Sequence, residues 1–260
     1  MPHIEEHPAG EFCWFELGTS DQAAAKNFYC SLFGWSADDF PIGPGGFYTT
    51  FNIEGRSCAA AYTLEKQMVE QGIPPHWMIY VAVDSADAVA AKCTGLGGKV
   101  LQPPFDVFDF GRMAVLQDPT GATFSIWEAR KHKGSAITEV PGTMNWGELS
   151  TNDPARAVEF YSGLFGWKMM TGEGGDYLHI NNGKQMIGGI PPAAHRDPNV
   201  PPHWLMYFTV TDCDATAAKA SSMGASLLLP PMTMEKVGRF GVIRDPQGAV
   251  FAIFQHLNEG

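Results

Sequence analysis

Two short sequence stretches, each present twice, carry side chains that could transfer a proton or bind a ligand. The tetrapeptide Pro-Pro-His-Trp (PPHW) occurs with its histidine at His76 and again at His203. Each half of the chain also has one glutamate in a Trp-x-Glu-Leu stretch, at Glu16 and Glu148. Histidine titrates near neutral pH and is a common metal ligand, and a positioned carboxylate can accept a proton. Each histidine could therefore bind a metal, move a proton, or only begin a strand.

The elements that must position these residues are also repeated. The stretch "WFELGTSDQAAAKNFYCSLFGW" begins at Trp14, and "WGELSTNDPARAVEFYSGLFGW" begins 132 positions later, at Trp146. The two PPHW copies are 127 positions apart, so the second half lacks five residues between the two motifs. Self-similarity of this kind indicates a duplicated structural unit. We expect domains at residues 10–130 and 143–257, joined by a polar linker at 131–142 that contains Gly and Pro.

Each domain divides again into two units of one strand, one helix and three strands. In the first unit, Asp21 can cap the helix and Gly34 can end it. In the second half, Asp153 precedes a proline at the first helical position, where the missing N–H of proline costs nothing. The pattern predicts helices near residues 21–33, 85–97, 153–165 and 212–223.

This pattern resembles the vicinal oxygen chelate superfamily, which contains glyoxalase I, bleomycin-resistance proteins and extradiol dioxygenases. The resemblance rests on the Asp…Phe-Tyr…Leu-Phe-Gly-Trp pattern after the first strand of each half, on Val-x-Asp before the second helix, and on Asp-Pro-x-Gly before the last strand. It covers nearly the whole chain. It implies an α+β fold of four βαβββ modules, which form two tandem domains with curved mixed sheets. In metal-dependent members of the family, two modules form a cup in which His or Glu side chains bind a divalent cation.

The resemblance also locates the metal-ligand positions of the family in this chain. Divalent cations of this kind prefer nitrogen, carboxylate or thiolate donors, which Trp, Met, Leu and Ala do not supply. The strand stretches "SCAAAYTL" and "QMIGGIPP" offer no acid for a fourth ligand. We therefore expect no metal and no other cofactor at these positions, which are Trp14, Met78 and Ser125 in the first half and Trp146, Leu205 and Ala252 in the second.

Alternation along a strand extends the concave face of each cup to residues two positions from these ligand positions. The candidate catalytic residues Glu16, His76, Glu148 and His203 then face the cups. An apolar pocket with a few converging polar groups is the usual form of a small-molecule site. The residues expected to bind the ligand are Trp14, Met78, Tyr80, Ser125, Trp127, Trp146, Leu205, Tyr207 and Phe254.

Structural roles compete with each of these interpretations. The two PPHW histidines could only satisfy backbone groups where a strand begins. The glutamates could pair with Arg112 and Arg239, or with the histidines, as structural bridges. Tryptophans are often ordinary core residues. The sequence leaves these alternatives open.

Composition and charge exclude several classes of partner. The net charge of −11 argues against nucleic acid and anionic membranes, which attract basic surfaces. No apolar run approaches the roughly 18 residues of a membrane span, and the acidic N-terminal stretch does not resemble a signal peptide. The five cysteines have no zinc-binding spacing. We expect a cytoplasmic monomer or homodimer with reduced thiols and a small-molecule partner.

The function predicted from the sequence is binding of a small apolar or aromatic molecule in a metal-free cup. One alternative is a lyase or isomerase in which a Glu/His pair abstracts a proton next to a carbonyl. Another is a divalent-metal glyoxalase or dioxygenase with shifted ligands, among them His76 and His203.

Overall fold

The computed structural model describes residues 4–43, 46–172 and 175–257. In the first half, two of the four expected modules form eight strands and two long helices, α1 and α3, with a short helix α2 between the modules. The bounds are β1 (Phe12–Thr19), α1 (Gln22–Phe33), β2 (Ser36–Gly43), β3 (Gly46–Ile53), β4 (Arg56–Thr63), α2 (Lys66–Glu70), β5 (His76–Ala82), α3 (Ala86–Gly95), β6 (Lys99–Val107), β7 (Gly111–Gln117) and β8 (Thr123–Ala129).

The second half repeats the same order. The bounds are β9 (Met144–Ser150), α4 (Pro154–Phe165), β10 (Lys168–Thr171), β11 (Leu178–Asn182), β12 (Gln185–Ile190), the short 3₁₀ helix η1 (Ala193–His195), β13 (His203–Thr209), α5 (Cys213–Ser222), β14 (Ser226–Met234), β15 (Gly238–Arg244) and β16 (Val250–His256). The four helices expected from the sequence are therefore confirmed. The sequence did not predict α2 and η1, which lie in the connections that lead to the PPHW motifs.

The predicted helix ends are confirmed in detail. The side chain of Asp21 accepts a hydrogen bond from Ala24 N at 3.0 Å, and Asp153 accepts one from Arg156 N. Gly34 ends α1 in the left-handed conformation, with φ of 73°, which a residue without a Cβ adopts at little cost. These caps fix where α1 and α4 begin and how the chain leaves α1.

Two modules of the same half join edge to edge into one curved sheet. The strand order of the first sheet is β2-β3-β4-β1-β5-β8-β7-β6, and the second sheet has the order β10-β11-β12-β9-β13-β16-β15-β14. The join is the antiparallel pair β1–β5, in which Trp14 lies opposite Tyr80 and Glu16 opposite Met78. Each concave face therefore belongs to a single half. The sequence left this pairing open.

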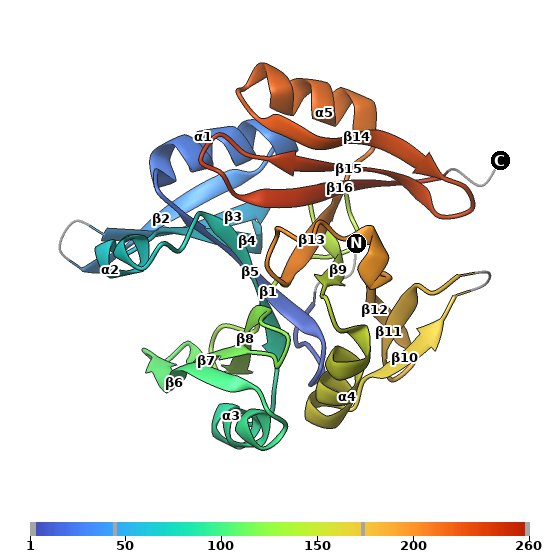
Figure 1. Ribbon diagram of the computed structural model, residues 1–260. Coiled ribbons are helices and arrows are strands. Elements are labelled where there is room, and N and C mark those ends of the chain that lie inside the picture. Colours follow the sequence, from blue (N-terminus) through green and yellow to red (C-terminus); the bar gives the residue numbers. More distant parts are fainter. Residues whose placement is uncertain (1–3, 44–45, 173–174, 258–260) are drawn as a thin grey trace.

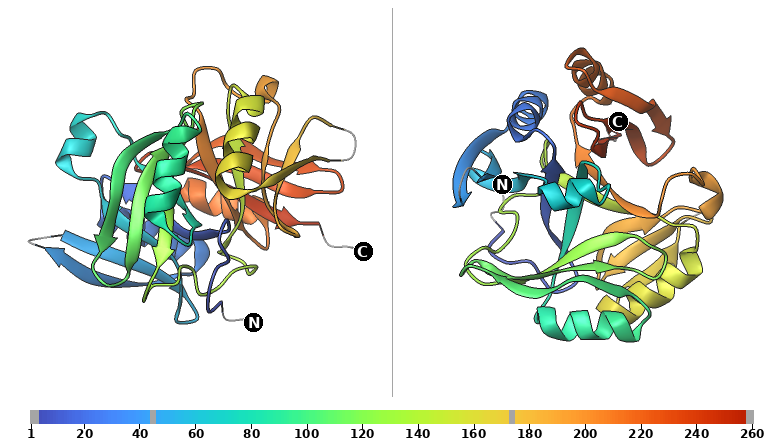
Figure 2. Two further views of the ribbon diagram at one scale, coloured as in Figure 1. Left: turned by 90° about the horizontal axis from the view of Figure 1, so that it is seen from below. Right: turned by 60° about the vertical axis from the view of Figure 1, so that its left-hand side comes forward.

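The two sheets meet back to back in the middle of the molecule. In Figure 1 the concave faces point to opposite sides, and α1 lies beside α5 while α3 lies beside α4. Both views of Figure 2 show α3 and α4 side by side. One large core contains buried side chains from both halves. The aromatic rings of Phe12 and Trp204 are 5.4 Å apart across this interface, and those of Trp77 and Phe208 are 5.2 Å apart.

Helices and the other half of the chain together cover the apolar face of each sheet. Close packing here requires a glycine. A Cβ built on Gly147 would lie 2.7 Å from the ring of Phe12 and 3.1 Å from Ile79, so a larger residue would force the two sheets apart.

The tryptophan of each PPHW motif has a structural role in this interface. Trp77 Nε1 donates a hydrogen bond to Tyr29 Oη at 3.0 Å, and Tyr29 Oη donates to Asp245 of the other half at 2.8 Å. The second half mirrors this chain of bonds with Trp204, Tyr161 and Asp118. The Asp-Pro-x-Gly turns therefore link the two halves through buried polar contacts. Within the described ranges, no helix is long and apolar enough to cross a membrane.

Candidate functional site: two aromatic cups

The first cup is the concave face of the first sheet around Trp14, Glu16, Tyr48, Tyr80 and Trp127. Two tyrosine hydroxyls donate to the carboxylate of Glu16, Tyr48 to Oε1 at 2.7 Å and Tyr80 to Oε2 at 2.5 Å. Trp14 Nε1 donates to the hydroxyl of Tyr48 at 2.9 Å. The carboxylate of Glu16 thus lies among aromatic side chains, and each of its oxygens accepts a hydrogen bond.

The second cup repeats this arrangement around Trp146, Glu148, Tyr177, Tyr207 and Phe254. Tyr177 donates to Glu148 at 2.9 Å and Tyr207 donates at 3.1 Å, while Trp146 Nε1 donates to Tyr177 at 3.0 Å. Duplication has therefore preserved four side chains and their hydrogen bonds.

Sequence reasoning missed one tyrosine of each cup. Tyr48 lies on β3 and Tyr177 lies just before β11, and they are 129 positions apart. That separation falls between the 132 and 127 positions of the flanking repeats. Aligning the halves with two successive deletions would have paired these tyrosines.

Burial sets the protonation of the cup residues. It raises the pKa of Glu16 and of Glu148, and the tyrosine hydrogen bonds oppose this rise without cancelling it. The pKa of Tyr80 is raised by burial and by the nearby carboxyl of Glu16. The phenols therefore remain protonated donors at neutral pH, and each carboxyl keeps its proton to a higher pH than an exposed one.

The PPHW histidines make local contacts. His76 Nδ1 lies 2.8 Å from the carbonyl oxygen of Pro74, and His203 Nδ1 lies 2.8 Å from that of Pro201. Because a carbonyl only accepts, Nδ1 carries the proton and Nε2 keeps the lone pair. Burial lowers the pKa of both rings. Each histidine thus closes its own Pro-Pro turn where the strand begins.

In the part of the chain that the structure describes, neither histidine is hydrogen-bonded to the glutamate of its cup; the tyrosines hold the carboxylates instead. In the strand register His76 lies opposite Gly18, one pleat beyond Glu16, and His203 lies opposite Ser150.

The register also shows what surrounds each carboxylate. Trp14, Tyr80 and Ser125 lie in one row across β1, β5 and β8, while Glu16 lies between Met78 on β5 and Ala60 on β4. In the second sheet the corresponding row contains Trp146, Tyr207 and Ala252, and Glu148 lies between Leu205 and Gly189. Each cup therefore brings together one carboxyl group, two phenols and apolar side chains.

Comparison with known proteins identifies the family. The family model described as "Glyoxalase/Bleomycin resistance protein/Dioxygenase superfamily" matches residues 11–126 and again residues 129–253. The chain belongs to this superfamily. The resemblance inferred from the repeated motifs is thereby confirmed, as is the tandem α+β fold.

Two kinds of relative align with this superfamily member over almost its whole length. The Mycobacterium bovis protein named "Putative glyoxylase CFP32" is 42% identical, over 98% of this chain and 98% of the relative. The Streptomyces peucetius "Anthracycline biosynthesis protein DnrV" is 35% identical, over 96% of this chain and 94% of the relative.

Solved structures share the fold at low identity. The Mn(II)-bound glyoxalase from Novosphingobium aromaticivorans has a TM-score of 0.67 at 18% identity, covering 96% of this chain and 83% of that one. The 2,3-dioxygenase LapB from Pseudomonas sp. KL28 has a TM-score of 0.66 at 12% identity, covering 96% and 95% of the two chains.

The residues of this superfamily member do not fit a divalent metal of the kind bound by that glyoxalase. The described residues contain no group of three or more His, Cys, Asp or Glu side chains that could hold an ion. Each cup offers one carboxyl group, and the indole of Trp14 already donates its N–H to Tyr48. One carboxyl group, whose oxygens already accept from two phenols and whose other neighbours are apolar, is too small a donor set for such an ion.

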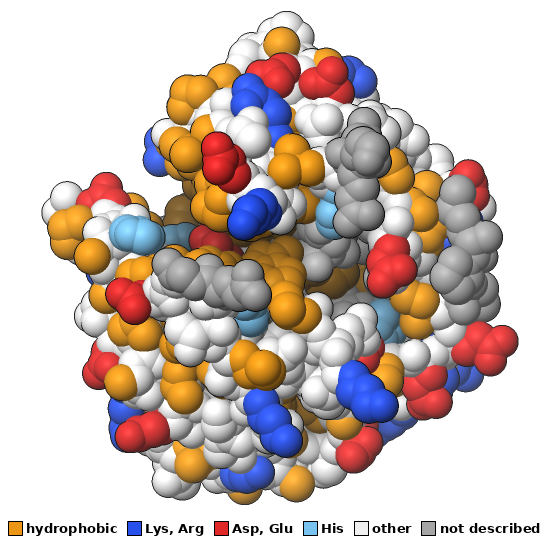
Figure 3. Space-filling view, turned by 90° about the vertical axis from the view of Figure 1, so that its right-hand side faces the viewer, with side chains coloured by type: hydrophobic (Ala, Val, Ile, Leu, Met, Phe, Trp, Pro, Cys, Tyr) orange, Lys and Arg blue, Asp and Glu red, His pale blue; other side chains and the backbone are white. Residues whose placement is uncertain are grey.

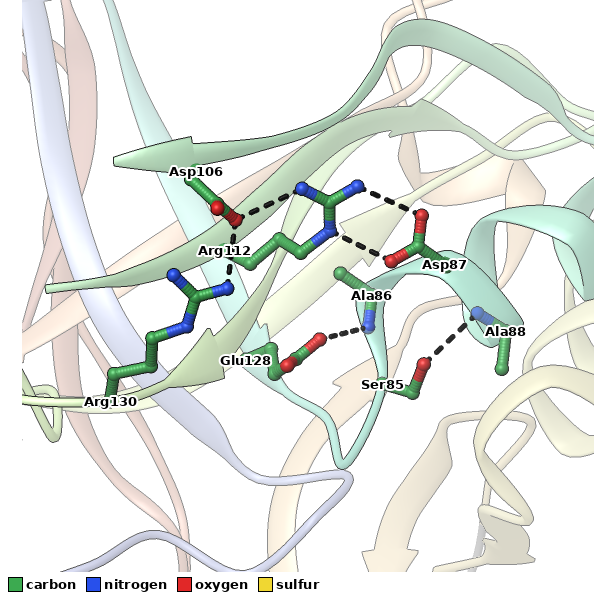
Figure 4. Close-up of polar contacts among 8 residues, drawn as sticks. All are labelled: Ser85, Ala86, Asp87, Ala88, Asp106, Arg112, Glu128 and Arg130. Atoms are coloured by element: carbon green, nitrogen blue, oxygen red, sulfur yellow. Dashed lines mark hydrogen bonds and ion pairs between the residues drawn. The ribbon is translucent and has the colours of Figure 1, made fainter. Parts of the chain in front are cut away.

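The arginines at the ends of β7 and β15 do not pair with the cup glutamates, so that structural alternative is wrong. Arg112 forms a bidentate pair with Asp87 on α3 and also contacts Asp106, which Arg130 shares (Figure 4). Arg239 pairs in the same way with Asp214 on α5. These arginines tie helices to strands at the surface.

The glycine before each arginine makes room for an aromatic wall of the cup. A Cβ on Gly111 would lie 2.3 Å from the ring of Trp127, and a Cβ on Gly238 would lie 2.3 Å from the ring of Phe254. The two rings thus occupy equivalent places in the two cups.

Proposed function

We propose that this protein binds a small, flat, apolar or aromatic carbonyl compound in a metal-free aromatic cup. The observation that carries the proposal is the glutamate held by two tyrosine hydroxyls beside an indole, which occurs in both halves. An apolar cavity in which a few polar groups fix the orientation of the ligand is the usual design of a small-molecule site.

The carboxyl group is the expected contact for the polar end of the ligand. Because burial raises the pKa of Glu148, the neutral form persists to a higher pH and can donate a hydrogen bond to a carbonyl oxygen. The indole of Trp146 and the ring of Phe254 provide the apolar walls. Aromatic rings gain about 0.5–1.5 kcal/mol per well-placed ring pair beyond the burial of their area.

The names of the relatives agree with such a ligand. A glyoxylase is named for a carbonyl substrate, and the Streptomyces peucetius relative is named for the biosynthesis of anthracyclines, which are polycyclic aromatic compounds with carbonyl groups. A neutral aromatic ketone such as 2-acetylnaphthalene combines both features and is a suitable probe.

Proton transfer is a second candidate function, favoured by the same raised pKa. Glu148 would remove a proton from the carbon next to the carbonyl, and the electron pair would move to the carbonyl oxygen. In a substrate whose carbon–carbon double bond conjugates with this enolate, return of the proton to the far carbon of that double bond, as the electron pair moves back from the oxygen, would complete an isomerisation. This reaction needs the carboxylate, whereas binding needs the neutral acid.

The pH dependence of binding tests the proposal. We expect the affinity for 2-acetylnaphthalene, measured by equilibrium dialysis on metal-stripped protein, to be constant at low pH. It should fall as pH rises through the raised pKa of Glu148, by about tenfold per pH unit where only the neutral acid binds. Glu148→Gln keeps a hydrogen-bond donor that does not titrate, so its affinity should not change with pH.

Two results would contradict the proposal. One is binding of the probe that requires added Mn²⁺. The other is the same pH profile for wild type and Glu148→Gln. The proton-transfer function predicts a different result. The rate of isomerisation of a carbonyl substrate would rise as pH rises through the pKa of Glu148, and Glu148→Gln would lose this activity.

A further inference from the structure

The two cups differ in the side chains that lie against their aromatic walls. In the first cup Trp14 is only 3% exposed and Trp127 only 6% exposed. The imidazole of His132, from the linker, lies edge-on against both rings, with centroids 4.4 Å from Trp14 and 5.7 Å from Trp127. Trp127 Nε1 also donates to the carbonyl oxygen of His132 at 2.9 Å. The chain's own side chain thus fills the aromatic end of this cup.

Backbone hydrogen bonds fix the linker in this place. His132 N donates to Phe110 O at 3.0 Å, and Ser135 N donates to Cys13 O at 2.7 Å. Gly134 between them has φ of 103°, and a Cβ there would lie 2.4 Å from the oxygen of Cys13. Only a glycine allows so close an approach. The position of His132 is therefore built into the fold.

His132 makes the kind of contact that a ligand would make. Its Nε2 is buried without a hydrogen-bond partner among the described residues. Burial, with a smaller effect of His7, lowers the pKa of His132 to about 4. At neutral pH the ring is flat and uncharged, and it is held by aromatic contacts and by its backbone.

Among the described residues, no single ring bridges the aromatic walls of the second cup in this way. His179 lies against Trp146, with ring centroids 6.0 Å apart, and His256 lies against Phe254 at 4.9 Å. Each of these histidines thus contacts one of the two walls, and His179 also lies 5.3 Å from the ring of Tyr177.

The sequence and the exposure of the walls agree with this difference. The position that corresponds to His132, 127 residues later, is Glu259, a residue type without a ring, and it lies outside the described residues. Trp146 and Phe254 are both partly exposed, whereas the walls of the first cup are buried. Figure 3 shows a hollow with hydrophobic side chains on the face that carries β10–β12 and β14–β16.

We propose that His132 is an intramolecular plug of the first cup, and that the slot between Trp146 and Phe254 of the second cup takes a flat, uncharged aromatic ring. Each chain then binds one ligand, and the first cup is a latent second site. The inference rests on the proposed function and assigns it to one cup.

Stoichiometry tests this inference. Equilibrium dialysis of 2-acetylnaphthalene should give one site per chain for the wild type and two for His132→Gly, which removes the plug. His132→Phe keeps a flat ring in place and should retain one site. Leu205→Arg places a long cation beside Glu148 in the second cup and should abolish binding, whereas Gln67→Arg on the exposed surface of α2 should not.

The outcomes separate the inference from the proposed function. Two sites in the wild type, one remaining site in Leu205→Arg, or a single site in folded His132→Gly would each overturn the plug while leaving cup binding intact. Should His132→Gly fail to fold, the wild-type and Leu205→Arg results still decide. No binding by any variant would overturn the proposed function itself.

Discussion

Replacing Asp118 with alanine is expected to lower the free energy of unfolding by about 3–5 kcal/mol. Asp118 is only 2% exposed, and its Oδ1 accepts hydrogen bonds from the backbone N–H groups of Thr120, Gly121 and Ala122. Its Oδ2 accepts one from Tyr161, across the interface between the halves. Alanine would remove the acceptor of the buried N–H of Ala122 and of the buried hydroxyl of Tyr161, which costs more than the loss of the bonds alone.

Urea unfolding followed by far-UV circular dichroism measures this effect. Asp153→Ala is the matched control, because its side chain is exposed and accepts from one backbone N–H, Arg156 N. That variant should lose about 1 kcal/mol, as helix N-caps do. Equal losses for the two variants would show that the Asp-Pro-x-Gly turn does not hold the halves together.

The second large effect is expected on binding. Trp146→Ala should weaken the binding of 2-acetylnaphthalene by tenfold to hundredfold, which corresponds to about 1.4–2.7 kcal/mol. The indole forms one wall of the second cup, and its N–H holds Tyr177 against Glu148. Its removal therefore takes away both the wall and the donor that orients a tyrosine.

Trp146→Phe separates these two contributions, because phenylalanine keeps an aromatic wall and lacks the N–H. We expect it to lose less affinity than alanine. Dialysis at one fixed pH, below the raised pKa of Glu148, compares the three proteins. An unchanged affinity in Trp146→Ala would place the ligand elsewhere.

The sequence was sufficient for the fold because the duplication is explicit. Repeats at fixed separation identified the modules, and side-chain alternation placed Trp14, Glu16 and Tyr80 on one face, as the β1–β5 register confirms. Alternation predicts the face on which a side chain lies only for strands whose position a repeated motif fixes. It gave no register for β3 and β11, so Tyr48 and Tyr177 were missed.

Contacts between distant segments could not be predicted from the sequence. His76 forms a hydrogen bond with the carbonyl oxygen of Pro74, only two residues away. Side-chain alternation along a strand does not predict such a local contact. Arg112 finds its aspartates on α3 and β6, which the sequence could not place beside it. The linker was expected only to join the domains, yet His132 reaches into the first cup because backbone bonds to Phe110 direct it there.

A crystal structure of the metal-stripped protein grown with 2-acetylnaphthalene tests the central claim most directly. We expect the naphthalene ring between Trp146 and Phe254, its carbonyl oxygen within hydrogen-bond distance of the Glu148 carboxyl, and His132 still in place in the first cup. A ring bound only in the first cup, or a second cup that takes the compound only through a divalent ion, would contradict this claim.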